Sequence, residues 1–575
     1  MNRIPIRIDV AITLAAPFHV GGGKGGAGAC NYLVRDCEGL PYWPGSAFKG
    51  KVRHYARLLY EGAAAGQCGF EHSLADGDRV TRCACMVCEL LGGAGNAKGS
   101  LLFGDMRLTA ANTAMRAGNA IDRCRRTAKD DHLFQVETAA ADMLIGEITG
   151  TLDKENFDDQ KNLLEAAIKA IPHIGGNTGR GLGWVKSIAV NITVIEANEH
   201  AADAKAFPLV TLPVKLTAQA PLLIGTRTSE SNFRATLHHV PGAVVRAALA
   251  QALIARDGGA MQGKVNWVAQ AGGRGQFPTL RRAFGDLRIT QFMPSCRFPC
   301  EGCRFAPMTA KHLKYGKAKD NSFDTLLHHP QADTRTERVK VFINARGELA
   351  DPIQTMVATK SAMNRFSGTS QDEMLFSAEV MTPPAVFAGT VSGRFDPEEL
   401  VRLVENGIRV GGYQTAGYGR CAVDIGPPIG AADTREQLRG RIDQCGGKIP
   451  VTLLSDAVVS LAEPEDVSNE GYLQVYQKTL FDDLPGVTLT KAIAQHSQWR
   501  GFDTSKRTED ILEQQTLHVI QAGAVFLLEA ELTDGLLDKL LALQSNGICK
   551  EDIHNRNGCG QIRVADDYHF LREET

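Results

Sequence analysis

The chain has 575 residues, of which 43% are hydrophobic and 22% are charged, and its formal net charge at pH 7 is -2. At roughly 100–200 residues per domain, this length predicts about three or four globular domains. The composition excludes a disordered chain, and the near-neutral charge excludes a uniformly basic nucleic-acid binder. Any RNA contact must therefore come from local clusters of Arg and Lys.

The first residues (1–9) alternate charged and aliphatic side chains and lack the apolar core of a signal peptide. The sequence has no apolar run of about 18 residues or more, the length that a membrane span requires. We therefore expect a cytoplasmic protein that makes no membrane contact. Its 14 cysteines are then expected to be free thiols or metal ligands rather than disulfides.

A pattern that occurs three times along the chain is the clearest feature of the sequence. Each copy opens with an alternation of period two, typical of a half-buried strand, at residues 4–14, 210–216 and 449–453. In the first two copies a glycine-bearing turn follows, and then a Pro-Gly pair opens a helix, at 44–53 and 241–250. Repetition in this order predicts homologous units in tandem.

The first Pro-Gly helix has residues suited to binding a phosphate. Ser46 is predicted to be its N-cap. Lys49 and Arg53 are four residues apart and therefore lie on one face of the helix. Free N–H groups and the positive end of the helix dipole at this end can hold an anion.

The later parts of the copies also match one another. Residues 101–109 match 282–290, and each segment contains a Phe-Gly-Asp motif whose Asp is predicted to cap a local turn. Residues 120–137 match 362–379. Each copy ends in a glycine loop with an Arg nearby and then a final strand, over 177–190, 414–425 and 555–564. Glycine permits positive φ and the close approach of another chain, which we interpret as an RNA backbone.

The order of strand, glycine turn, helix, central strands, helix, glycine loop and strand predicts an α+β class. We expect tandem ferredoxin-like (RRM-like) domains, the scaffold of many RNA-recognition proteins. The expected domains span 1–200, 208–430 and 448–575. The linkers are expected at 197–208 and 426–447, the second with a polar helical patch.

Three motifs in this order, PGSAFKGKVR at 44–53, IDRCRRTAKDDHLFQVE at 121–137 and GRGLG at 179–183, resemble the RAMP superfamily of CRISPR-associated proteins. Over about 1–196 the chain looks like the backbone subunit of type III effector complexes. The remainder resembles the type III-D RAMP subunit, which binds the five-prime handle, in the motifs at 240–250, 364–380, 451–460 and 555–564. The resemblance implies a fusion of the two kinds of subunit.

The resemblance also implies a role in CRISPR interference, an antiviral defence. The implied partners are crRNA, target RNA, other RAMP backbone subunits and a large polymerase-like CRISPR subunit. Base pairing would supply the sequence specificity, and protein would contact phosphates and shape. The residues expected to contact RNA are Lys24, Ser46, Lys49, Arg53, Arg123, Gly179, Arg180, Gly181, Gly183, Arg227, Arg246, Arg365, Gly417, Gly419, Arg420, Arg556, Gly558, Gly560 and Arg563.

Backbone subunits of this family often cut target RNA with an Asp in the loop before the Pro-Gly helix. This chain has Cys30 or Asn31 there, and neither is a carboxylate or an imidazole. We therefore expect a subunit without a catalytic residue. The alternative is a RAMP endoribonuclease that cuts target RNA or matures crRNA, with Asp36 or His19 as its catalytic group. A zinc-stabilised scaffold that binds only proteins is a further alternative.

Two cysteine groups have the spacing of zinc ligands. The first comprises Cys83, Cys85 and Cys88, with Cys68 or His72 as the fourth ligand. The second comprises Cys296, Cys300, Cys303 and, nearby, His312. We predict two structural Zn²⁺ sites that fix zinc-binding insertions, rather than reduced loop cysteines or a redox Cys-x-x-Cys pair.

Overall fold

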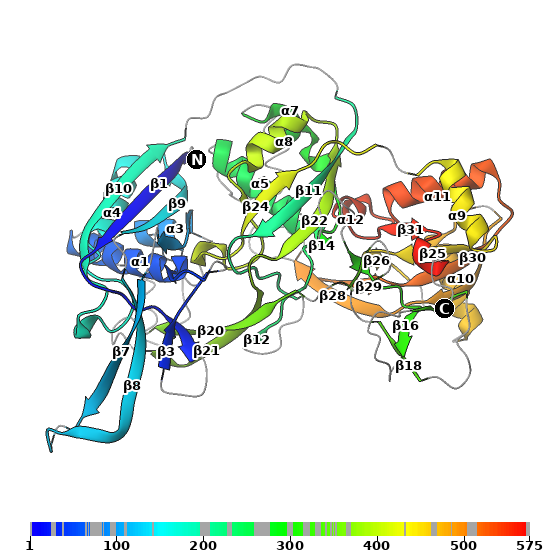
Figure 1. Ribbon diagram of the computed structural model, residues 1–575. Helices are drawn as coiled ribbons and strands as arrows, with labels where there is room; N and C mark the ends of the chain where they lie inside the picture. Colours follow the sequence, from blue (N-terminus) through cyan, green and yellow to red (C-terminus); the bar gives the residue numbers. More distant parts are fainter. Residues whose placement is uncertain are drawn as a thin grey trace.

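The computed structural model of the chain describes residues 3–24, 30–36, 39–63, 66, 68, 83, 85–92, 99–108, 112–122, 124–140, 143–195, 207–226, 233–257, 276–295, 303–313, 323–327, 335–339, 342–344, 348, 350, 353–363, 370–430, 433–461, 468–484, 486–502 and 514–570. These residues form three mixed α/β units that lie in a row (Figure 1). We call them the first unit (3–195), the second unit (207–430) and the third unit (433–570). Within the described ranges, no helix combines the length and the apolarity that crossing a membrane requires.

The first unit has a sheet in the order β10-β1-β9-β6-β4, with β5 also paired to β9. The alternation at 4–14 predicted its first strand, in which Ile6, Ile8, Val10 and Ile12 are all buried. Helices α1 and α4 supply Phe48 and Leu164 to the same core. The elements are β1 (Arg3–Leu14), β4 (Tyr42–Trp43), α1 (Gly45–Gly62), α3 (Met86–Leu91), β5 (Leu101–Phe103), β6 (Met106–Leu108), β9 (Met143–Asp153), α4 (Phe157–Lys169) and β10 (Val185–Val194).

The second unit repeats this arrangement, with the order β13-β22-β11-β24-β23 and β14 paired to β22. As in the first unit, the opening strand lies between the closing strand and the strand before the second helix. The elements are β11 (Val210–Ala218), α5 (Gly242–Asp257), α7 (Pro278–Ala283), β13 (Arg288–Ile289), β14 (Met293–Pro294), β22 (Val386–Gly393), α8 (Pro397–Val404), β23 (Ile408–Arg409) and β24 (Arg420–Ile425).

The third unit has the order β27-β30-β25-β31, so its opening strand occupies the same place. All five residues of β25 are buried, whereas the alternation predicted a half-buried strand. The second face is covered by the end of the chain, where Nε2 of His569 lies 2.7 Å from Oγ1 of Thr452. The elements are α9 (Arg435–Gln444), β25 (Ile449–Leu453), α10 (Asn469–Leu480), β27 (Thr488–Ile493), β30 (Val525–Glu529), α11 (Asp534–Asn546), α12 (Asp552–Arg556) and β31 (Ile562–Val564).

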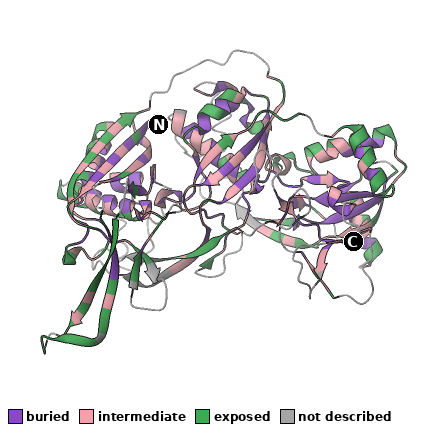
Figure 2. Ribbon diagram, in the orientation of Figure 1, coloured by how far each residue is buried: buried purple, intermediate pink, exposed green. Residues whose placement is uncertain are grey.

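Each unit also has a second, smaller sheet built around a hairpin. In the first unit β3 runs parallel to β8, and in the second unit β12 runs parallel to β21. The β7–β8 hairpin projects away from the first unit and is exposed along most of its length (Figures 1 and 2). The elements are β2 (Gly21–Lys24), β3 (Cys30–Leu33), β7 (Asn112–Ile121), β8 (Ala128–Ala140), β12 (Phe233–Arg234), β20 (Thr355–Met363), β21 (Ser370–Met381), β26 (Ala457–Val459), β28 (His496–Phe502) and β29 (Gln514–Ile520).

An insertion between β14 and β20 of the second unit packs on the third unit. Oδ2 of Asp324 lies 3.0 Å from Nδ1 of His569, and both side chains are fully buried. Arg304 forms an ion pair of 2.5 Å with Asp566, which is also buried. The elements of the insertion are β15 (Arg304–Phe305), β16 (Ala310–Leu313), β17 (Phe323–Asp324), β18 (Thr336–Arg338) and β19 (Phe342–Ile343).

Candidate metal centre and nucleic-acid interface

Four cysteines of the first unit lie together beside α1. Their Sγ atoms are all within 4.8 Å of one another, and the residues are Cys68, Cys83, Cys85 and Cys88. Cys85 is the N-cap of α3, where its Sγ accepts the N–H of Cys88 at 3.4 Å. The structure therefore brings Cys68 close to the pair Cys85 and Cys88. Cys68 is one of the two residues that the sequence predicted as the fourth ligand. The other, His72, lies outside the described residues.

The chemistry of this cluster fits a bound cation. Hydrogen bonding to Cys68 and burial raise the pKa of the Cys85 thiol, and burial raises the pKa of Cys88 to about 11. Without a cation Cys85 and Cys88 are therefore neutral thiols, because burial leaves a thiolate poorly solvated at these positions. Metal binding requires thiolates, and a divalent cation would stabilise them here. Four sulfur donors in this space suit tetrahedral coordination.

Arg53, predicted to contact RNA, is instead part of this cluster. Its side chain is buried, with Nη2 donating to Sγ of Cys88 at 3.3 Å and Nη1 donating to the carbonyl of Gly92. A buried guanidinium with these partners does not reach an RNA surface. The sequence predicted that this face of the helix binds phosphate, but at Arg53 the face points into the protein.

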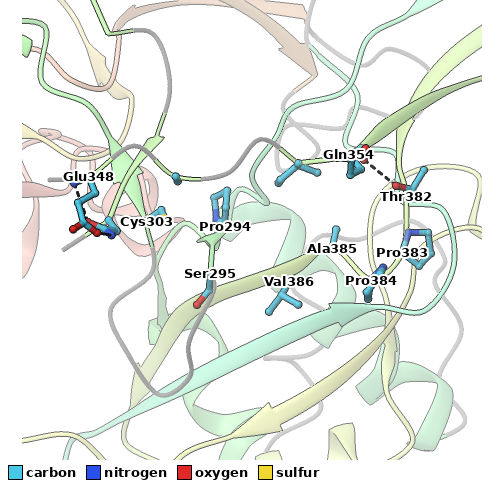
Figure 3. A pocket seen from close by; sticks show the side chains of 13 residues that line it. Pro294, Ser295, Cys303, Glu348, Gln354, Thr382, Pro383, Pro384, Ala385 and Val386 are labelled. Atoms are coloured by element: carbon cyan, nitrogen blue, oxygen red, sulfur yellow. Dashed lines mark hydrogen bonds between the residues drawn. The ribbon is translucent and has the colours of Figure 1, made fainter. Parts of the chain in front are cut away.

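The second cysteine group is described only in part. Cys296 and Cys300 lie outside the described residues, while Cys303 is buried and His312 lies on β16. This zinc site stays a prediction. Cys303 lines a hollow of about 510 Å³ (Figure 3), whose only charged side chain among the described residues is Glu348, bonded to Asn344. On the far side of the hollow, Thr382 donates to the carbonyl of Gln354. These groups form no acid–base pair.

The two fallback catalytic residues both have structural contacts. Oδ1 of Asp36 accepts the N–H of Leu40 at 2.9 Å and so closes a turn before α1. His19 is buried, and its Nδ1 lies 2.7 Å from the carbonyl of Glu137 on β8. Asn31 is exposed, and the side chain of Cys30 lies outside the described residues. Both residues therefore have structural contacts within the first unit, and a catalytic role for either stays untested.

The helix start expected to bind phosphate also differs from the prediction. The N-cap of α1 is Pro44 rather than Ser46, and it makes no side-chain cap. Oδ1 of Asp105, the Asp of the first Phe-Gly-Asp motif, accepts the N–H of Gly45 at 2.7 Å. Asp105 therefore caps a helix that is distant in sequence, not a local turn. Lys49 and Ser46 are partly exposed on this helix.

The three closing glycine loops share one backbone geometry. Positive φ values occur at equivalent glycines, namely +83° at Gly181, +94° at Gly417 and +78° at Gly558. Each loop is closed by a hydrogen bond from an N–H to the carbonyl of its last glycine, from Ile174 to Gly183 (2.8 Å), from Val410 to Gly419 (2.7 Å) and from Ile548 to Gly560 (2.8 Å). The three repeats in sequence are thus three copies of one loop.

Two of these loops lie against the preceding unit and not in solvent. A Cβ at Gly417 would lie 3.3 Å from the backbone nitrogen of Gly45 in the first unit. A Cβ at Gly558 would lie 2.6 Å from the carbonyl oxygen of Ile289 in the second unit. The chain that approaches these glycines is polypeptide, which corrects the expectation that they contact RNA. The last glycines, Gly419 and Gly560, are buried within their own loops.

Four arginines expected to contact RNA instead join the units or pair with acids. Arg246 donates to Oδ1 of Asn557 at 2.6 Å and to the carbonyl of Arg556 at 2.9 Å, and burial lowers its pKa to about 10. Arg556 pairs with Asp286 at 2.8 Å. The remaining two ion pairs are Arg420 with Glu147 (3.1 Å) and Arg563 with Asp433 (3.5 Å).

The loop of the first unit is the exception. Gly179, Arg180 and Gly181 are exposed, and a Cβ on either glycine would meet no atom of the described residues within 4 Å. The guanidinium carbon of Arg180 lies 4.8 Å from the ring centroid of Phe134 on β8. Gly183 is buried within the loop. Arg123, Arg227, Arg365 and the side chain of Lys24 lie outside the described residues.

The β7–β8 hairpin has basic residues that the sequence reasoning missed. Arg125 and Arg126 in its turn are exposed, as are Arg116 and Lys129 on its strands. The charge run RCRRTAK at 123–129 was the available signal. The same hairpin exposes large apolar side chains, with Ile121 and Leu133 each 64% exposed.

One family model matches part of the first unit. Residues 11–186 match the family model of the RAMP superfamily. The matched residues include the cysteine cluster, the exposed β7–β8 hairpin and the central part of the first unit's sheet, and the match supports a CRISPR-associated RAMP protein. A search of curated proteins finds no match to the chain.

Proposed function

We propose that this chain is an RNA-binding subunit of a type III CRISPR effector complex. It binds crRNA along its backbone and at its five-prime handle, and it helps to position target RNA for interference. The match of residues 11–186 to the RAMP superfamily is the observation on which the proposal depends. The three equivalent sheet orders support tandem ferredoxin-like RAMP domains, the first of backbone type and the second of the handle-capping type.

The RNA surface that we propose is the β7–β8 hairpin together with the exposed side of the first unit near Lys49. Arg125, Arg126 and Lys129 are exposed on the hairpin and suit phosphates. Ile121 and Leu133 present apolar surface beside them, and such side chains can lie against bases or between base steps. Because the net charge of the chain is -2, this local basic group matters more than the overall field.

Zinc is the metal that best suits the cysteine cluster. The four ligands would be Cys68, Cys83, Cys85 and Cys88, a set that leaves no open coordination position. The role of the ion would therefore be structural. It would hold α3 and the segment around Cys68 against α1, in addition to the contacts of Arg53 with Gly92 and Cys88. We propose a second structural zinc at Cys296, Cys300, Cys303 and His312.

The partners that follow from this function are crRNA, target RNA, other RAMP backbone subunits and a large polymerase-like CRISPR subunit. The proposed location is the cytoplasm. The test is to purify the complex through a tag on this chain, extract its nucleic acid and sequence it. We expect RNAs of defined length that begin with a repeat-derived five-prime handle. A particle without RNA at moderate salt would refute the proposal.

A further inference from the structure

We infer that the glycine loop of the first unit, residues 177–183 with Trp184, docks on the Pro-Gly helix start of a separate RAMP-type subunit. We call this segment the docking loop. The inference deepens the proposed function, because it names a partner within the same complex and the surface that meets it. The same contact between a glycine loop and a Pro-Gly helix start occurs twice between neighbouring units of this chain. This contact involves protein atoms only and does not depend on how RNA is bound.

The first instance joins the second unit to the first. Gly417 approaches the start of α1, where its Cβ would lie 3.3 Å from the nitrogen and 3.4 Å from the Cα of Gly45. Oδ1 of Asp105, which caps this helix, would be 2.7 Å from the same Cβ. A glycine is required at 417 because another residue would collide with the helix start that it covers.

The second instance joins the third unit to the second in the same way. Gly242 is the Pro-Gly helix start of α5, and its Cβ would lie 2.6 Å from the carbonyl oxygen of Asn557, next to Gly558. Arg246, one turn into this helix, donates to Oδ1 of Asn557. The equivalent loop thus covers the equivalent helix start at both joints.

The docking loop has the same backbone, but no described residue of the chain covers Gly181 in this way. The N–H of Gly176 donates to the carbonyl of His19 at 2.8 Å, as that of Gly412 donates to Leu223 at 2.8 Å. Gly417 and Gly558 are buried at their joints, whereas Gly181 is exposed and has open space around its Cβ position. The positive φ of Gly181 belongs to the loop geometry, and the open space at its Cβ position leaves room for the helix start of another chain.

Trp184 provides a second and independent observation. The residue at this position reaches the preceding unit at both internal joints. Arg420 pairs with Glu147 at 3.1 Å, and Oε1 of Gln561 accepts the N–H of Gln291 at 3.3 Å. In the first unit the position is a tryptophan that is 48% exposed, with its ring 6.1 Å from that of His173. Exposed tryptophan is costly in water and is enriched at the centres of protein interfaces.

The partner must be a different chain, because a second copy of this chain has no uncovered Pro-Gly helix start among its described helices. The start of α1 is covered by Gly417, and that of α5 by Asn557. The equivalent helix of the third unit, α10, has no Pro-Gly pair and is capped by Ser468, whose Oγ accepts the N–H of Gly471 at 3.1 Å. The feature that the partner must offer is therefore an uncovered Pro-Gly helix start, of the kind found at Gly45 of α1 and Gly242 of α5.

The test uses the complete complex purified through this chain, with a photoreactive benzoylphenylalanine in place of Gly179. This glycine is exposed, its Cβ position is open and its φ is not positive, so the replacement is tolerated by the loop. We expect irradiation to join it to a peptide of another RAMP-type subunit that contains a Pro-Gly helix start. Crosslinks only to RNA, or to a second copy of this chain, would overturn the inference. So would the absence of any crosslink.

A paired set of substitutions measures the contact. Trp184→Ala should reduce the amount of the preceding subunit that copurifies by about tenfold or more, because it removes a central contact. Gly430→Trp, at an exposed glycine with open space, is the control and should leave it unchanged. Equal retention of the partner by Trp184→Ala and Gly430→Trp would overturn the inference. RNA content is read in the same samples, so failure of the docking contact and failure of the RNA-binding function give different results.

Discussion

Gly417 of the second unit covers Gly45 of the first, with only 3.3 Å between the backbone nitrogen of Gly45 and the position that a Cβ of residue 417 would occupy. The contact joins a loop to the beginning of a helix that precedes it by more than 350 residues. It places the strained backbone of the loop where no side chain fits, so the identity of residue 417 is set by another unit.

This contact predicts a difference between two glycines of similar backbone. Gly417→Ala and Gly181→Ala both place a Cβ at positive φ, at +94° and +83°, and both should lose roughly 1–2 kcal/mol of stability through backbone strain. Gly417→Ala should lose about 1–3 kcal/mol more, because it also collides with Asp105 and Gly45. Urea denaturation of the two variants measures the difference. Equal losses would show that the joint does not constrain residue 417.

The cysteine cluster predicts a defined metal content. Cys88→Ser should lower the zinc bound per chain by about one ion and reduce the temperature at which the first unit unfolds, because a structural zinc contributes folding free energy. Mass spectrometry of the metal and thermal denaturation are the measurements. Cys124→Ser, at an exposed cysteine on the hairpin, serves as the control and should change neither. A full zinc content in Cys88→Ser would contradict the assignment.

Arg53 is expected to matter for stability and not for RNA affinity. Arg53→Met leaves the carbonyl of Gly92 without this donor and should lower the free energy of unfolding by roughly 2–4 kcal/mol. The salt dependence of RNA binding should stay as in the wild type. Arg57→Met, on the same helix and half-buried, should have a smaller effect on stability. Denaturation and RNA binding at several salt concentrations would be compared, and a changed salt dependence in Arg53→Met would argue against its buried position.

A buried histidine predicts sensitivity to acid. Burial, and to a lesser extent the neighbouring His238, lowers the pKa of His239 from its ordinary 6.5 to about 4. The unfolded chain therefore binds a proton that the folded chain rejects between these values. Stability should be constant above about pH 6.5 and should fall by about 3 kcal/mol towards pH 4.

Denaturation at pH 7 and at about pH 4 tests this effect. His239→Gln should remove that part of the pH dependence, whereas His132→Gln, at an exposed position on β8, should leave it in place. The same acid sensitivity in wild type and His239→Gln would assign the effect to other groups.

The hairpin predicts a change in the salt dependence of RNA binding. Replacing Arg125 and Arg126 with alanine should weaken binding to guide RNA and reduce the slope of log affinity against log salt by roughly 1–2, because each phosphate contact contributes about 0.7 for a single strand. Lys186→Ala, at an exposed position on β10, is the matched control and should leave the slope unchanged. An unaltered slope in the hairpin variant would remove the hairpin from the RNA surface.

The sequence predicted the regular elements well where a physical period defines them. Side-chain alternation located β1, β11 and β25, because one face of each strand must be buried in its core. The cysteine spacing likewise predicted the pair Cys85 and Cys88. The choice of Cys68 as their neighbour depended on the folded path of the chain, which the spacing alone does not determine.

The partners of the glycine loops could not be predicted in this way. A pattern of glycines reports that the backbone needs positive φ and room for a neighbour, and a phosphate chain and a helix start satisfy that need equally. Gly181, Gly417 and Gly558 therefore look alike in the sequence, yet one is exposed and two are covered. The same limit applies to Arg246, whose position on its helix resembles that of a surface cation although it bonds to the third unit.

The covered helix starts also have a consequence for assembly. A subunit with both an exposed docking loop and an uncovered helix start can bind another subunit at either end. The number of subunits in such an assembly then depends on concentration. In this chain the two contacts between units form within one polypeptide. The linked units therefore have a high effective concentration for one another, and their order is set by the order of the chain. One docking loop is exposed, and the helix starts of α1 and α5 are already covered. The chain can therefore bind to one end of an assembly of RAMP-type subunits, and no further subunit can then bind to its covered helix starts.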